Sequence, residues 1–343
     1  MKRGYMDLRT ELLPREQLEA RQKEFIQGFA DADIDAAVVY ADVASADELI
    51  FLTNLGPYWV NTAGIFFKDG RVFIVTGFSP RVNPWVAHIT GMAPELIVAA
   101  GTKINAKVAS ILKEQIGGKG VIGITGGYFP QEMADAIHSA GFETAVYEKS
   151  PKGQLTKRDK AYLATIGQGI GLMGPAIEKV LKSPETGGMT RRQVAAEIEY
   201  ACRTAGAMDF IILNGDENLI FDQPQDIAES EKPWTVYIQI QYLGEWLVRA
   251  FNMEEGYASN ALASRDKFAE GLKPGRAGLS CSRDGYDFRV CTKITSDHLF
   301  APERDTSALS DGQVVTLAVA DRARGIYLEN MYFVSERGGR LLF

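Results

Sequence analysis

A polar stretch with proline and glycine, KSPKGQLT at residues 149–156, most constrains how this chain can fold. It interrupts an otherwise regular series of helical and strand patterns, and such residues break both kinds of element. The chain is therefore expected to divide here into two domains, residues 1–150 and 151–343. Because 46% of the 343 residues are hydrophobic, a sizeable core is expected and wholesale disorder is excluded.

The first segment alternates between helical and strand patterns, which predicts an α/β layout with a mixed sheet. Residues 14–34 place apolar side chains among charges as an amphipathic helix does. Two apolar runs surround Asp69-Gly70, a strong signal for a two-residue hairpin. Further helices are expected at 103–116 and 130–140, and further strands at 36–40, 120–125 and 143–148.

The second segment begins with a long helical pattern in which apolar residues recur every three or four positions from Leu163 to Val180. The glycines within it indicate a kink or a close helix contact. Thr190 and Gln193 match a capping box that would start a second helix. Strand patterns follow at 210–214, 235–242, 245–253, 314–320 and 326–335, with a third helix at 262–272.

Composition limits the class of function. The net charge is −7 without a long basic block, so neither nucleic acid nor an anionic membrane is an expected partner. No apolar run is long enough to span a membrane, and the N-terminus lacks the apolar core of a signal peptide. Three cysteines, an odd number, favour reduced thiols and a cytoplasmic location. Only three histidines are present, which excludes chemistry that needs several imidazoles.

The order of these elements, with five local patterns, resembles the creatinase/prolidase/aminopeptidase P family. The patterns are FLTNLG at 51–56, TRRQVAAEIEYACRTAGA at 190–207, a hairpin ending in Arg249, LKPG at 272–275, and LSDGQVVTLAV followed by GIYLENMYFVSERGG at 309–339. The resemblance implies an α+β chain with a creatinase-type N-terminal α/β domain followed by a pita-bread C-terminal domain. It also implies a homodimer in which the neighbouring subunit's N-terminal domain closes the active site, placing Arg81 or Trp59 near a ligand.

Peptidases of that family bind two metal ions through two aspartates, one histidine and two glutamates. By resemblance Glu329 matches the final glutamate, and His298 lies near a family histidine position. The residues at the remaining positions are Gln239 or Gln241, Trp246 and Ala318. An amide, an indole and a methyl group cannot hold a dinuclear centre, so neither metal nor cofactor is expected.

Creatinase is a metal-free branch of the family, and the resemblance to it is partial. Its acid/base histidine ends a GxNxxxxH stretch, and GDENLIFD at 215–222 places Asp222 at that point. Asp222 or His298 would therefore move the proton. Glu329 would hold a cationic or amide group, although an outward-facing strand residue is its structural alternative. Asp222 also fits an ordinary turn former.

Four further residues are expected to contact substrate. Arg249, in an apolar strand, would orient a carboxylate or pair with Glu329 or Glu245. Glu245 lies near the position of creatinase's other guanidinium-holding glutamate, which Val248 occupies. Gln239 and Gln241, two residues apart on one strand, would supply amide contacts.

These residues predict metal-independent hydrolysis of an amide or amidine C–N bond in a small polar metabolite, or a related lyase reaction. The alternative is a catalytically inactive pseudo-peptidase that binds a ligand or serves as a scaffold. Cys281 and Cys291 leave further interpretations open, of which a pair of metal ligands has only a weak signal because no second pair of thiols accompanies them. Either one is a nucleophilic thiol activated by Arg283 or Arg289, or both are inert cysteines.

Overall fold

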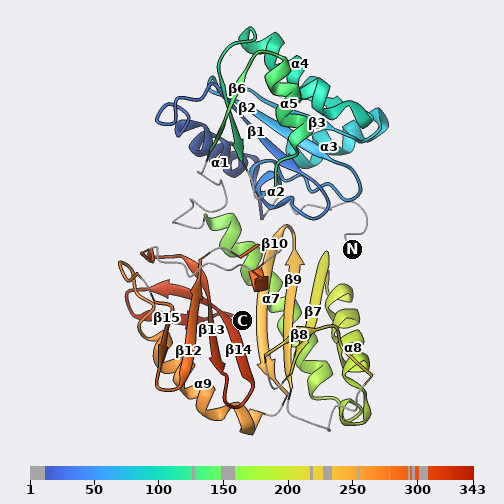
Figure 1. Cartoon of the computed structure of the whole chain (residues 1–343). Helices are drawn as coiled ribbons and strands as arrows, with labels where there is room; N and C mark the ends of the chain where they lie inside the picture. The colour runs from blue at the N-terminus through green and yellow to red at the C-terminus, as the bar shows by residue number, and fades with distance from the viewer. Residues whose placement is uncertain are drawn as a thin grey trace. The chain divides into compact units, whose positions relative to one another are not determined.

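The computed structural model describes residues 12–125, 128–147, 159–216, 219–226, 234–253, 255–277, 279–292, 294–295, 298–300 and 308–343. The chain divides into two compact units, Lys2–Leu155 and Thr156–Phe343, each described by itself (Figure 1). Within the described residues, no helix is long and apolar enough to cross a membrane.

The first unit is a six-stranded mixed sheet with the strand order β4-β3-β2-β1-β5-β6. The β1–β5, β5–β6 and β3–β4 pairs are parallel and the other two are antiparallel, so the predicted mixed sheet is confirmed. The strands are β1 Ala36–Ala41, β2 Thr62–Phe67, β3 Val72–Thr76, β4 Ile97–Ala99, β5 Val121–Thr125 and β6 Glu143–Val146. The predicted hairpin joins β2 to β3, where Gly70 has a φ of +93° that glycine adopts without strain.

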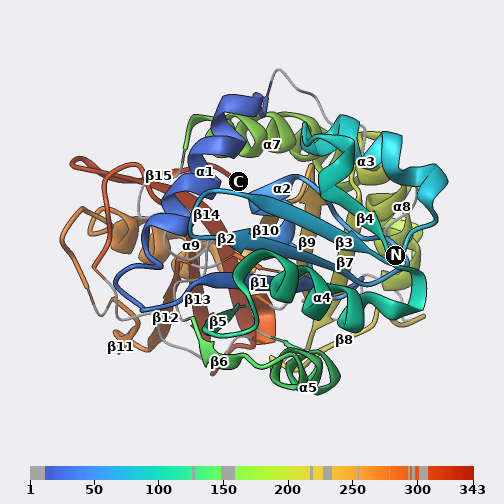
Figure 2. The same cartoon turned by 90° about the horizontal axis from the view of Figure 1, so that it is seen from above.

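Helices cover both faces of this sheet. Ala36 and Val38 of β1 pack in one core with Val108 and Leu112 of α4, while α1 and α2 contact β2 on the other side (Figure 2). The helices of the unit are α1 Arg15–Gln27, α2 Asp47–Thr53, α3 Asn83–Thr90, α4 Ile104–Ile116 and α5 Gln131–Ser139. The helix expected over 14–34 therefore ends earlier, at Gln27, where Gly28 caps it.

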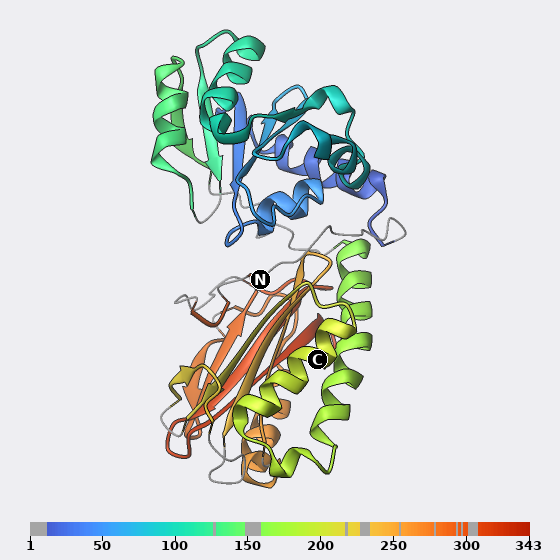
Figure 3. The ribbon, with the colours of Figure 1, turned by 90° about the vertical axis from the view of Figure 1, so that its right-hand side faces the viewer.

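The second unit is an antiparallel sheet with the order β11-β12-β13-β14-β10-β9-β7-β8, with β15 paired to β14. Its strands are β7 Asp209–Gly215, β8 Phe221–Asp222, β9 Thr235–Tyr242, β10 Glu245–Asn252, β11 Cys281–Arg283, β12 Tyr286–Cys291, β13 Val314–Asp321, β14 Ile326–Ser335 and β15 Gly338–Leu341. Three helices, α7 Lys160–Leu181, α8 Arg191–Thr204 and α9 Glu255–Ala269, pack against it, and Figure 3 shows α7 and α8 along one side of the sheet.

The two faces of this sheet differ in chemistry. Leu247 of β10 packs in the core with α7, and Leu317 of β13 packs in the core with α9. Ala318, Glu329 and Ala250 lie directly opposite one another across β13, β14 and β10, on the other face. We call the two sides the helix face and the Glu329 face.

Two predicted local features position α7 and α8. Thr190 and Gln193 form the capping box at the start of α8, as predicted. Gly169 accounts for the close contact expected in α7, because a Cβ there would lie 3.0 Å from side-chain atoms of both Leu247 and Tyr242.

Candidate functional site

The centre of the Glu329 face is an ion pair between His298 and Glu329. Nε2 of His298 lies 2.8 Å from Oε1 of Glu329, and both side chains are 0% exposed. Strand β14 supplies Glu329, whereas His298 lies in a 3-10 turn, His298–Phe300, between β12 and β13. The hydroxyl of Thr316 lies 3.2 Å from the same Nε2 and fixes the orientation of the ring.

The pairing determines the charge of both groups. Burial disfavours the protonated form of His298, but Glu329 outweighs burial and raises the pKa of His298 to about 10. Burial likewise disfavours the Glu329 carboxylate, but His298, Arg289 and Tyr327 together lower its pKa to about 2. At neutral pH the site therefore holds an imidazolium beside a carboxylate.

Two further residues, Tyr327 and Arg289, interact with the Glu329 carboxylate. The Tyr327 hydroxyl donates to Oε2 of Glu329 at 2.7 Å and accepts from Nη2 of Arg289 at 2.9 Å. Arg289 also lies 3.5 Å from Oε1 of Glu329. A buried ion pair is tolerated only when its remaining hydrogen-bonding capacity is met, and here Tyr327 and Arg289 meet it for Glu329 and Thr316 for His298.

An aromatic and amide wall borders this cluster. The Tyr237 hydroxyl donates to Oε1 of Gln239 at 2.9 Å, and Nε2 of Gln239 donates to the Thr295 carbonyl at 2.5 Å. The ring of Phe221 contacts the rings of both Tyr237 and Tyr327. Burial, reinforced by the nearby Glu329 carboxylate, raises the pKa of each tyrosine well above its usual value, so both remain protonated donors.

Three of the expected site residues meet here. His298 and Glu329 are in direct contact, and Gln239 joins them through the Thr295 carbonyl, which accepts from both the Gln239 side chain and the His298 backbone N–H. Gln241 shares a strand face with Gln239 and is completely buried, and its amide has no hydrogen-bond partner among the described residues. Such a buried amide is costly unless something bonds to it.

Asp222 does not join this cluster. It is exposed and lies directly opposite Asn214, and Asn214 is paired with Val236 on the helix face. Its carboxylate accepts from the adjacent backbone N–H of Gln223, which is the behaviour of a turn residue. The expectation that Asp222 occupies the acid/base position is therefore corrected, since its neighbour Phe221 is the residue that faces Tyr237 and Tyr327.

Arg249 and Glu245 lie on the helix face, opposite Ile238 and Tyr242. Arg249 forms its ion pair with Glu178 of α7 at 3.0 Å, so the expected pairing with Glu329 or Glu245 is wrong. A strand's period of two explains the result, because Arg249 is one residue from Val248 and Ala250 and must point the opposite way. Arg81 is exposed in the first unit, in the short turn Pro80–Val82, and its expected contact across a dimer stays a prediction.

Four contributors were not predicted from the sequence: Tyr237, Arg289, Thr316 and Tyr327. Two of them carried a signal, since Tyr237 and Tyr327 lie two residues before Gln239 and Glu329 and must share their face. The sequence indicates Arg289 only as a charged neighbour of Cys291. Its position beside Glu329 depends on the pairing of β12 with β13, which opposes Arg289 to Ala318.

The donor set does not fit a dinuclear metal centre. On the Glu329 face, the hairpin of β9 and β10 presents phenol, amide, indole and aliphatic groups and no carboxylate. Glu329 is committed to three donors, and the described part of the chain contains no group of three or more His, Cys, Asp or Glu side chains able to hold a metal ion.

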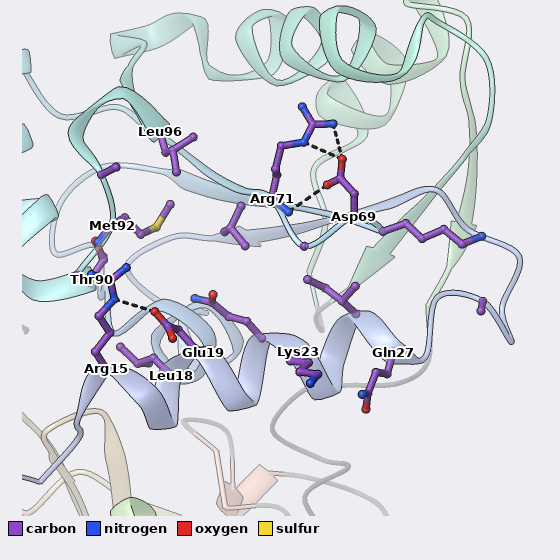
Figure 4. A pocket seen from close by; sticks show the side chains of 18 residues that line it. Arg15, Leu18, Glu19, Lys23, Gln27, Asp69, Arg71, Thr90, Met92 and Leu96 are labelled. Atoms are coloured by element: carbon purple, nitrogen blue, oxygen red, sulfur yellow. Dashed lines mark hydrogen bonds and ion pairs between the residues drawn. The ribbon is translucent and has the colours of Figure 1, made fainter.

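The first unit carries a separate hollow of about 760 Å³, lined by α1, the β2–β3 turn and the segment after α3 (Figure 4). Its charged groups include two local ion pairs, Arg15 with Glu19 and Asp69 with Arg71, and all four side chains are largely exposed. These are features of a solvated groove, in contrast to the buried ion pair of the second unit.

The two units together define a creatinase-type α/β domain and a pita-bread domain, which is the fold expected from the resemblance. Solved structures agree. Prolidase from Pyrococcus horikoshii OT3 is similar at 14% identity and a TM-score of 0.74, over 94% of this chain and 97% of that one. Xaa-Pro dipeptidase from Bacillus anthracis is similar at 17% identity and a TM-score of 0.75, over 96% and 97%.

Aminopeptidase P from E. coli is similar at 13% identity and a TM-score of 0.64, over 96% of this chain and 95% of that one. No family model matches the sequence, and no curated protein matches it. The resemblance read from the sequence is thus confirmed as a resemblance of fold.

Proposed function

We propose that this protein is a hydrolase that cleaves an amide or amidine C–N bond of a small polar metabolite without a dinuclear metal centre. The observation that carries the proposal is the buried ion pair of His298 with Glu329, at 2.8 Å. Solved structures of the same fold are named prolidase, dipeptidase and aminopeptidase, which supports hydrolysis of a C–N bond. A lyase reaction would use the same proton-transfer groups.

The imidazolium of His298 is suited to act as a general acid. Its Nε2 proton is held by Glu329, and the doubly protonated ring can give a proton to the departing nitrogen. Glu329 stabilises the charged ring between transfers. After donating, the neutral imidazole is a base that can accept a proton from the incoming water.

Arg289 takes the anion-binding role expected of Arg249. Its side chain is 28% exposed, so the guanidinium reaches the surface of the cluster while bonding Tyr327. A guanidinium in this position stabilises a substrate carboxylate or a developing oxyanion. The unpartnered amide of Gln241 supplies a polar contact on the same face.

As part of the same proposal, the protein acts in the cytoplasm as a homodimer, with Arg81 contacting substrate across the interface. The alternative, a pseudo-peptidase that only binds a ligand, is favoured by one observation. Neither His298 nor Glu329 is exposed to solvent, as would hold for a purely structural ion pair.

A screen of small amides, guanidino compounds and amino-acid derivatives tests the proposal. Ligands that raise the melting temperature are assayed for release of ammonia or amine by chelator-treated protein. We expect hydrolysis of at least one ligand, lowered about 10²–10⁴-fold in His298→Asn, as for loss of a general acid/base group. Asp222→Asn is the matched control and should retain activity. Ligands that bind equally to both variants but are never cleaved would establish the pseudo-peptidase instead.

A further inference from the structure

Cys291, at the end of β12, lies beside the ion pair on the Glu329 face. It is directly opposite Thr316, whose hydroxyl contacts His298, and it is two residues from Arg289 on the same side of the strand. The Cys291 side chain also interacts with His298 and helps to raise the pKa of the imidazole. A thiol, an imidazole and a carboxylate are therefore connected in series.

We propose that Cys291 is the nucleophile of a Cys291–His298–Glu329 triad, an inference that rests on the hydrolase function proposed above. The arrangement has the two contacts that covalent catalysis requires, from the nucleophile to the base and from the base to an orienting group. Thiol activation requires a cationic neighbour, and Cys291 has two, the His298 imidazolium and the Arg289 guanidinium.

The oxygen-bearing side chains on this face are less suited than the Cys291 thiol to act as the nucleophile. Glu329 is a poor nucleophile because three donors hold its oxygens. Tyr237 and Tyr327 remain protonated, since burial and the Glu329 charge oppose their ionisation. Thr316 carries an alcohol, a far weaker acid than a thiol.

The reaction balances in two steps. The Cys291 thiol loses its proton to solvent beside the His298 imidazolium, and the Cys291 sulfur attacks the amide or amidine carbon. The C–N bond then breaks, and the nitrogen leaves with the proton from His298, which gives a thioester or its imino equivalent on Cys291. A water molecule, losing its proton to His298, attacks the same carbon, and the C–S bond breaks, which restores the His298 imidazolium and releases the Cys291 sulfur for another cycle.

The chain contains its own controls. Cys281 is exposed on β11, away from the ion pair's strands. Cys202 is buried in the core of the second unit, where burial raises the pKa of its thiol to about 12. The three thiols therefore differ in their surroundings within one protein: Cys291 lies near His298, Cys281 is exposed, and Cys202 is in the core.

The test is alkylation of the intact protein with iodoacetamide at pH 6.5, with each cysteine followed by peptide mass spectrometry. We expect Cys291 to react about tenfold faster than Cys281, in spite of its 8% exposure, and Cys202 to stay unmodified. His298→Asn should bring the rate at Cys291 to that of Cys281 or below. Urea-unfolded protein, in which all three thiols should react alike, controls for peptide detection.

Two outcomes would overturn the triad: alkylation of Cys291 no faster than that of Cys281, or a fast rate that survives His298→Asn. The result separates the two proposals. Unreactive Cys291 together with hydrolysis that needs His298 leaves the hydrolase and removes the covalent step. Reactive Cys291 without any hydrolysis removes the hydrolase and leaves an activated thiol. Circular dichroism of His298→Asn confirms that the variant is folded.

Discussion

Nε2 of His298 and Oε1 of Glu329 lie 2.8 Å apart in a site that excludes solvent from both side chains. The hairpin of this sheet face carries no carboxylate, so Glu329 has no acidic neighbour there with which to share a cation. The histidine, together with Arg289 and Tyr327, supplies the positive charge and hydrogen bonds that the carboxylate requires. The relationship explains both how the chain tolerates a buried charge and where acid/base chemistry would occur.

Glu329→Gln should destabilise the fold strongly, because it leaves the buried His298 imidazolium and the partly exposed Arg289 guanidinium without their counter-ion. Removing one partner of a buried ion pair costs about 3–5 kcal/mol. Urea unfolding measures the change in the free energy of unfolding. Asp222→Asn, at an exposed position, should change it by less than about 0.5 kcal/mol. Equal stability of the two variants would mean that Glu329 is not held as described.

The stability conferred by the ion pair should depend on pH in both directions. The pKa of His298 is raised from 6.5 to about 10, so its contribution is complete below pH 6.5 and is lost as the pH rises toward 10. The pKa of Glu329 is lowered from 4.5 to about 2, so its contribution is complete above pH 4.5 and is lost as the pH falls toward 2. The full effect is therefore expected between pH 4.5 and 6.5.

Urea unfolding of the wild type and His298→Asn across pH 3–10 measures this dependence. The difference in unfolding free energy between the two proteins should be largest in that window and shrink on both sides. A difference that stays constant with pH would indicate that the pair is not ionised.

Substitution of Arg249 and of Arg289 should show that the first arginine has a structural role and the second a functional one. Arg249→Met removes a partly exposed ion pair with Glu178 and should cost at most about 1 kcal/mol, without loss of hydrolysis. Arg289→Met removes the guanidinium beside Glu329 and Tyr327 and should abolish hydrolysis or ligand binding. Steady-state kinetics or thermal shift with the best ligand compares them. The reverse ranking would restore the role that the sequence suggested for Arg249.

Alanine substitutions at two glycines of α7 test how closely this helix packs on the sheet. Gly169→Ala places a methyl group 3.0 Å from Leu247 and Tyr242 and should destabilise the protein by about 1–3 kcal/mol. Gly171→Ala meets no atom within 4 Å and should stabilise it by up to about 1 kcal/mol through helix propensity. Thermal unfolding distinguishes them, and an equal shift for both would show that α7 does not pack closely on β10.

Much of the fold could be predicted because its signals are local. The hairpin at Asp69-Gly70 and the capping box at Thr190 each depend on residues within a few positions. The pairing of His298 with Glu329 could be suspected only through resemblance, because it joins a short turn to a strand 31 positions away.

Which face a side chain occupies was the harder question. Arg249 and Asp222 have suitable chemistry and suitable positions along the chain, but the strand register turns both away from the site. Tyr237 and Tyr327 lie in register with Gln239 and Glu329, so a strict period-two reading would have included them. Arg289 required knowledge of strand order, which no local pattern contains.

Measurement of the pKa of His298 is the most direct test of the site. With three histidines in the chain, imidazole resonances followed by NMR from pH 5 to 11 can be assigned through His298→Asn. One imidazole is predicted to stay protonated past pH 8 and to lose its proton near pH 10, and Glu329→Gln should abolish this behaviour. If His298 instead loses its proton near pH 6.5, and does so whether or not Glu329 is present, the ion pair at the centre of this site does not exist.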